Sequence, residues 1–314
     1  MRNQLFAFAQ YLTPQTGLSR TAGWLAESPI KYIKNPLINW FIKTYKVDLT
    51  EAVIENPEQY KSFNDFFTRA LKADARTISD DANSVACPAD GMISELGTIT
   101  EGKIVQAKKH QYTTLELLGG DNRLAQQFEG GQFITVYLSP KDYHRVHMPV
   151  TGKLQQMVHI PGDLFSVNQA TADNIPRLFA RNERVVCVFN TELGPVALVL
   201  VGAMIVASIE TIWAGQITPQ AKQIQRWNYA DRQPLTLNKG EEMGRFKLGS
   251  TVIALFGKQA IEFTEKALPV SDVRMGETIA TIVNGRAGVN ETNSNSTTGD
   301  SSASVDDNAN DNNG

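Results

Sequence analysis

The chain has few cysteines, no long apolar run and little net charge, and each shortage excludes a class of protein. Its 314 residues include two cysteines, Cys87 and Cys187, which argues against a disulfide framework and fits a reducing compartment. The longest apolar run, Val196 to Ala207, has 12 residues, which is too short for a helix that spans a membrane. The formal net charge is −3, so nucleic acid is not an expected partner.

Several ligand motifs are also missing. The sequence contains no G-x-G-x-x-G motif, no Walker loop and no cysteine cluster, so we expect neither a nucleotide cofactor nor a metal. The first residues, Met1 to Gln4, do not have the pattern of a signal peptide. We expect a protein that is soluble or lies on a membrane surface, with enough residues for one large domain or two small ones.

Residues 1–75 are predicted to form a helical region. Asn35-Pro36 predicts the start of a helix. The apolar stripe of this helix consists of Leu37, Ile38, Phe41, Ile42 and Tyr45. Residues 1–50 hold six basic and two acidic side chains, and a basic amphipathic segment is typical of an interfacial membrane anchor. The alternative is that the stripe packs on the protein's own core, and the pattern allows both.

Residues 76–284 are predicted to form a β-rich domain, because short apolar runs alternate with Gly and Pro. Predicted strands cover 133–138, 152–160, 185–189, 196–209 and 251–256. We therefore expect an α+β protein whose mainly antiparallel body resembles a β barrel or sandwich. Residues 285–314 are mostly Asn, Ser, Thr, Gly and Asp, and such an acidic tail is expected to be disordered.

Three separate segments carry side chains suited to catalysis. Asp90 stands in the string Pro-Ala-Asp-Gly, His144 and His147 stand in Asp-Tyr-His-Arg-Val-His, and Ser250 stands in Leu-Gly-Ser-Thr. An Asp-Gly pair is usually a turn, and a glycine before a strand is usually a turn residue as well. The two histidines could be structural, could bind a metal or could transfer protons. These alternatives stay open on the residues alone.

Taken together, these strings resemble the bacterial phosphatidylserine decarboxylases. The strings Phe-Asn-Asp-Phe-Phe-Thr-Arg at 63–69 and Gly-Glu-Glu-Met-Gly-Arg-Phe at 240–246 extend the resemblance, which runs from about Met1 to about Val283. The resemblance implies that the chain cleaves its own Gly249–Ser250 bond. Asp90 would orient His147, His147 would take the proton of Ser250, and the alkoxide would attack the Gly249 carbonyl. The products would be a β chain of residues 1–249 and an α chain of residues 250–314, with Ser250 converted to a pyruvoyl group.

The resemblance also implies the reaction and its setting. Phosphatidylserine would be decarboxylated to phosphatidylethanolamine and CO2 through a Schiff base with the pyruvoyl group. His144 would lie at the decarboxylation site and supply a proton. The pyruvoyl group would be the cofactor, and the α and β chains would form a heterodimer that pairs with a second copy. The expected location is the cytoplasmic side of the inner cell membrane, as a peripheral protein that meets its lipid substrate there. Because that substrate is a membrane lipid, the resemblance favours the membrane-associating alternative for the helical region at 1–75.

Two other classes of function use the same residues differently. A serine hydrolase could employ Asp90, His147 and Ser250 on an ester or peptide, although the sequence lacks a G-x-S-x-G elbow. A non-catalytic β module could bind the membrane without doing chemistry. Self-cleavage separates these alternatives, because only the decarboxylase proenzyme is expected to split into a large and a small fragment.

Overall fold

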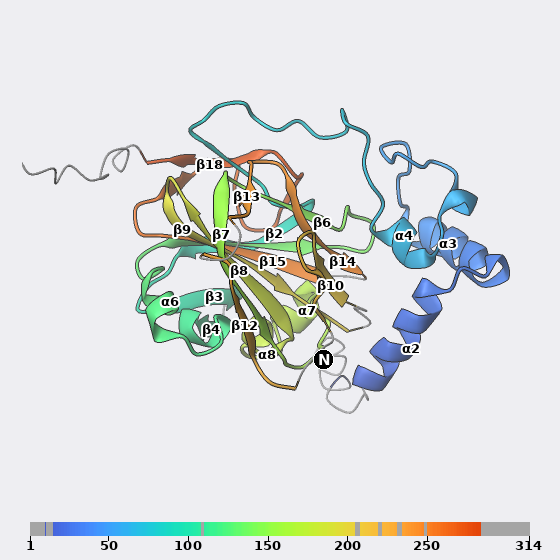
Figure 1. Cartoon of the computed structure of the whole chain (residues 1–314), viewed down its shortest axis with the longest axis horizontal. Coiled ribbons are helices and arrows are strands. Elements are labelled where there is room, and N and C mark those ends of the chain that lie inside the picture. The colour runs from blue at the N-terminus through green and yellow to red at the C-terminus, as the bar shows by residue number, and fades with distance from the viewer. Residues whose placement is uncertain are drawn as a thin grey trace, which may run out of the picture.

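The computed structural model describes residues 10, 15–107, 110–204, 208–218, 222–230, 234–247 and 250–283. In Figure 1, helices from the N-terminal region lie beside a body of strands. The strand pairings in this body are antiparallel, except for one isolated parallel bridge, so the predicted α+β class is confirmed. The predicted tail at 285–314 and two residues of the predicted cleavage string, Leu248 and Gly249, lie outside the described residues.

One nine-stranded sheet forms the centre of the body. Its strands, in spatial order, are β12 (Gln225–Asn228), β7 (Gly152–Ile160), β8 (Arg184–Thr191), β9 (Gly194–Val201), β15 (Ser250–Phe256), β5 (Gln132–Leu138), β2 (Gly91–Thr98) and β17 (Ser271–Val273), with β13 (Thr236–Leu237) also paired to β7. The described sheet is open between β12 and β17. The predicted barrel is therefore wrong, because the two edge strands, β12 and β17, are not paired with each other in the described part of the chain.

Smaller elements cover both faces of this sheet. On one face lie two sheets, made of β11 (Gly215–Gln216), β10 (Ser208–Thr211), β14 (Glu242–Lys247) and β6 (Arg145–His147), and of β1 (Ser84–Ala86), β18 (Thr278–Ile282) and β16 (Ile261–Phe263). On the other lie the hairpin β3 (Lys103–Ala107) and β4 (His110–Thr113) with helices α5 (Thr114–Leu117), α6 (Asn122–Gln126), α7 (Gln169–Ala172) and α8 (Leu178–Arg181). The body thus has three layers and an apolar core on each side of the central sheet.

Strand β15 is buried on both faces. Val252, Ala254 and Phe256 point into one core, while Ile253 and Leu255 point into the other. This burial explains why the strand reads as a continuous apolar run instead of an alternating one. The two cysteines behave as small apolar residues: both are free and buried, and burial raises the pKa of the Cys87 thiol to about 12.

The N-terminal region contains α2 (Gln15–Glu27), α3 (Lys31–Tyr45), the 3-10 helix η1 (Pro57–Gln59) and α4 (Phe63–Phe67). The predicted start of α3 is wrong, because Pro36 lies inside the helix and Ile30 precedes its first turn. Asn35 does not cap the helix, because its Oδ1 accepts a hydrogen bond from Lys34 Nζ at 2.8 Å. Among the described residues, no helix combines the length and apolarity that crossing a membrane requires.

The apolar stripe of α3 faces the protein's own interior. Ile38 and Phe41 are buried, and Phe41 packs edge-on against Phe63, Phe66 and Phe67 of α4. Ile38 and Phe41 therefore pack on the protein's own core, whereas Tyr45 of the same stripe is 38% exposed. Association of this region with a membrane stays a prediction. A separate set of large side chains on α2 and α3 is exposed to solvent: Trp24 at 70%, Tyr32 at 93% and Trp40 at 55%.

Candidate active site

Ser250 is the first residue of β15, the strand held between β5 and β9. It pairs with Leu138, the last residue of β5. Its side chain is completely buried, and its Oγ has no hydrogen-bond partner among the residues that the structure describes. A buried hydroxyl left without a partner costs about 1–3 kcal/mol, so a purely structural serine is a poor explanation for this position.

His144 lies in the segment that connects β5 to β6, and β5 pairs with β15, the strand that begins at Ser250. The His144 carbonyl accepts a hydrogen bond from the Phe246 N–H at 3.0 Å, and Phe246 precedes Ser250 by four residues. The segment from Leu138 to His144 thus contacts the chain near Ser250 at both of its ends. Leu138 pairs with Ser250, and His144 accepts the hydrogen bond from Phe246. The His144 ring is fully buried, stacks on Phe67 at a centroid distance of 3.9 Å, and has no partner within normal hydrogen-bond geometry on either nitrogen.

His144 is neutral at physiological pH. Burial lowers the pKa of its imidazole to about 3, and the nearby charge of Arg69 acts in the same direction. The Ser139 and Pro140 carbonyls oppose this effect. A neutral imidazole has one N–H that can donate and one nitrogen that can accept, so this ring can form hydrogen bonds to a group that enters the site.

His147 is held by two hydrogen bonds. Its Nδ1 is 2.8 Å from the Gly240 carbonyl oxygen, and its Nε2 is 3.0 Å from the Tyr143 hydroxyl. A carbonyl can only accept, so Nδ1 carries the proton and Nε2 accepts from the tyrosine. Burial lowers the pKa of this imidazole as well. His147 is therefore a neutral base whose accepting nitrogen is occupied in this structure.

Asp90 precedes β2 and binds Arg76 instead of a histidine. Arg76 Nε donates to Asp90 Oδ1 at 2.9 Å, Arg76 Nη2 bonds Oδ2, and the Met275 N–H donates to Oδ1 at 2.8 Å. Asp90 is still a near neighbour of His147, whose N–H donates to the Pro88 carbonyl. The structure thus brings Asp90 and His147 near each other, but the Gly240 carbonyl does the orienting that the sequence assigned to the carboxylate.

Gly91 allows this placement of Asp90. Its φ is +154°, and a Cβ on it would lie 2.2 Å from the Tyr137 carbonyl oxygen. The Asp-Gly pair is therefore the start of a strand that approaches β5 closely, and the usual reading of such a pair as a turn does not apply.

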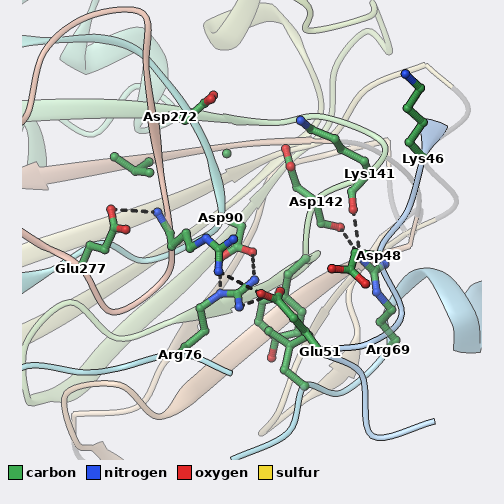
Figure 2. Close-up of a pocket in the computed structure, with 15 residues that line it drawn as sticks. Lys46, Asp48, Glu51, Arg69, Arg76, Asp90, Lys141, Asp142, Asp272 and Glu277 are labelled. Carbon is green, nitrogen blue, oxygen red and sulfur yellow. Dashed lines mark hydrogen bonds and ion pairs between the residues drawn. The ribbon is translucent and has the colours of Figure 1, made fainter. Parts of the chain in front are cut away.

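A charged pocket of about 390 Å³ opens beside these residues (Figure 2). Asp90 and Tyr143 line it, together with further acidic and basic side chains that include Arg69 and Arg76. Figure 2 shows Arg76 directed at Asp90, and Arg69 bonded to the backbone of the segment that carries Asp142. Arg76 was not predicted as a site residue, because its partner Asp90 lies 14 residues away. Tyr143 was not predicted either, although it stands inside the string Asp-Tyr-His-Arg-Val-His and its partner His147 is in the same string. Arg69 was not predicted as a site residue either, although it ends the string at 63–69 that contributed to the family resemblance.

Comparison with known proteins identifies the family. Residues 63–281 match the family model described as phosphatidylserine decarboxylase, and residues 5–46 match one described as PSD. The chain belongs to the phosphatidylserine decarboxylase family. It is 54% identical to the phosphatidylserine decarboxylase proenzyme of Azotobacter vinelandii and 56% identical to that of Pseudomonas entomophila, each over 89% of this chain and 98% of the relative. The Bordetella avium proenzyme is 55% identical over 89% of this chain and 95% of its own length.

The name proenzyme, printed for these relatives, describes a precursor that is processed before it acts. Within the described part of this decarboxylase-family chain, no group of three or more His, Cys, Asp or Glu side chains is placed to hold a metal. Ser250 has a buried hydroxyl with no hydrogen-bond partner among the described residues, which fits a site where the serine itself is modified.

Proposed function

We propose that the chain is a proenzyme that cleaves its own Gly249–Ser250 bond and then decarboxylates phosphatidylserine to phosphatidylethanolamine and CO2. The observation that carries this proposal is the buried Ser250 hydroxyl, which has no partner and lies at the end of the segment bonded to His144. Membership of the family supports the substrate.

Self-cleavage begins with proton transfer from Ser250 Oγ to His147, and the oxygen then attacks the Gly249 carbonyl. The Gly249 C–N bond breaks, an ester to Ser250 Oγ replaces it, and the freed amine of residue 250 takes the proton from His147. Elimination of this ester releases the Gly249 carboxylate and leaves dehydroalanine at position 250. The dehydroalanine tautomerises to an imine, and water hydrolyses the imine to the pyruvoyl ketone with loss of ammonia. Tyr143 must release His147 Nε2 before this nitrogen can take the proton, because its hydroxyl occupies that position. Asp90 acts on His147 through its negative charge, which favours the protonated imidazole, while the Gly240 carbonyl fixes the ring.

The pyruvoyl group formed at position 250 supplies a keto carbonyl that takes up the electrons released with CO2. The buried, neutral His144 then moves protons. It supplies the proton that the substrate carbon takes up after CO2 has left. Phe67 stacks on this imidazole, which shields the ring from water and holds its orientation.

The two chains are proposed to stay together as a heterodimer after cleavage. Strand β15 would belong to the α chain, yet it pairs with β9 and β5 of the β chain along nearly its whole length. Strands β17 and β18 pair likewise with β2 and β1. Separation would expose a completely buried strand and its ladder bonds, so the chains should part in denaturant only.

Denaturing gels and mass spectrometry test the proposal. Purified protein should run as a large and a small fragment, with a pyruvoyl group at the N-terminus of the small one, and should release CO2 from carboxyl-labelled phosphatidylserine. Ser250→Ala should give one intact, inactive chain. A serine hydrolase would instead remain a single band in its wild-type form, and that result would overturn the proposal.

Peripheral attachment to the cytoplasmic side of the inner membrane is proposed through the exposed aromatic residues of α2 and α3. Trp24, Tyr32 and Trp40 project from a segment with excess basic charge, and aromatic rings of this kind favour the membrane interface. The double variant Trp24→Asp with Trp40→Asp should sediment less with anionic liposomes and should still cleave itself. Leu268→Asp, at an exposed site on the β body, is the matched control. Equal sedimentation of all three proteins would refute this attachment.

A further inference from the structure

Arg69 is a buried cation with unused hydrogen-bond donors. Its side chain is only 5% exposed. Nη2 donates to the Lys141 carbonyl at 2.9 Å and lies 3.4 Å from that of Asp142, whereas Nε and Nη1 have no partner in the described part of the chain. Buried polar groups in proteins are nearly always satisfied, so two orphaned guanidinium nitrogens call for a ligand.

Other arginines in the chain have the hydrogen bonds or ion pairs that a structural role requires. Arg184 is equally buried, and all three of its side-chain nitrogens donate to carbonyl oxygens. Arg76 and Arg145 each pair with a carboxylate. Among the described residues, no carboxylate lies within ion-pair distance of Arg69, although its side chain lines the charged pocket. Arg69 therefore lacks acceptors for two of its nitrogens and has no carboxylate in contact, although the charges of Asp90 and Asp142 reach it through the pocket.

The position of Arg69 connects the pocket with the reacting groups. Phe67 stacks on His144, and Arg69, two residues later, binds the backbone just before His144. The charge of Arg69 reaches the His144 ring. An anion on Arg69 would therefore lie in the pocket, next to the segment that leads to His144.

We propose, on the basis of the decarboxylase function proposed above, that Arg69 binds the phosphodiester of the lipid head group. The substrate carries two kinds of anion, and the chemistry favours one of them. An arginine on the carboxylate would stabilise a charge that disappears as CO2 leaves, so it would favour the ground state over the transition state. The phosphodiester keeps its charge from substrate to product, and a guanidinium is well suited to hold it.

Kinetics of the processed enzyme test this role with simple anions as probes. Sodium dimethyl phosphate, a phosphodiester without a carboxylate, should inhibit wild-type CO2 release competitively, whereas sodium acetate at equal ionic strength should not. Arg69→Gln should raise KM by about 10- to 100-fold, which is the loss expected for one or two charged hydrogen bonds, change kcat only slightly, and lose the inhibition. Arg69→Lys should recover part of both effects.

A matched variant separates ligand binding from support of the loop. Arg145 Nε donates to the Thr68 carbonyl, so Arg145→Gln weakens the same contact between segments but leaves Arg69 in place. It should lower the thermal stability and keep the inhibition by dimethyl phosphate.

Three results would overturn the assignment: inhibition by acetate alone, undiminished inhibition of Arg69→Gln, or a loss confined to kcat. If the glutamine variant does not fold, the wild-type probes and Arg69→Lys still decide. A wild-type enzyme that releases no CO2 from phosphatidylserine would instead refute the underlying function.

Discussion

Replacing His144 with phenylalanine should flatten the pH dependence of stability, and the size of the effect follows from its burial. The ordinary pKa of histidine is 6.5, and in the folded protein that of His144 is about 3. Between these values the unfolded chain binds a proton that the folded protein excludes. Stability therefore falls as the pH drops below 6.5.

The magnitude comes from proton linkage. Between pH 7 and pH 5, a shift from 6.5 to about 3 removes about 2 kcal/mol from the free energy of unfolding. The same figure holds for any folded-state pKa well below 5, because the proton is then excluded at both pH values. His144→Phe keeps an aromatic ring against Phe67 and removes the titration.

Urea unfolding at the two pH values measures the difference. Both proteins should carry Ser250→Ala, so that each chain is a single piece, and the contribution of His147 is then common to both and cancels. The protein that retains His144 should lose about 2 kcal/mol more than the His144→Phe variant on going from pH 7 to pH 5. Equal losses would refute the conclusion that His144 is buried in its neutral form.

Two further substitutions probe the geometry around the site. Gly91→Ala should destabilise the protein by about 1–3 kcal/mol, because its Cβ would meet the Tyr137 carbonyl oxygen; thermal unfolding should show a larger loss than for Gly120→Ala, whose Cβ would have open space. Tyr143→Phe should accelerate self-cleavage by about 2- to 10-fold, the value of one hydrogen bond, because it frees His147 Nε2. A gel time course measures this rate, and slower cleavage would show that the tyrosine assists the base.

The strands of the body could be predicted from local patterns. The run from Thr251 to Phe256 is β-branched and apolar, and it forms a strand in the structure. Segments 133–138 and 152–160 were found in the same way. The single strand predicted at 196–209 is wrong in its extent, because β9 ends at Val201 and β10 begins at Ser208. Steric preferences and burial act residue by residue along a strand, so the sequence carries this information directly.

The surroundings of the site residues could not be predicted. The sequence singled out Asp90 and His147 but not the partners that hold them. Arg76 lies 14 residues from Asp90, and Gly240 lies 93 residues from His147. The Gly240 partner is a backbone carbonyl, which every residue possesses, so no residue type could mark it.

The sequence by itself determined which segments become strands, which residue types are available for proton transfer and where the chain is expected to cut itself. Tertiary structure decided that the stripe of α3 faces α4, that Asp90 binds Arg76, and that His144 and Ser250 are buried without partners. The physical reason is that these properties depend on the removal of water by segments that are distant along the chain. Local patterning can specify a strand, but it does not specify which distant groups will surround it.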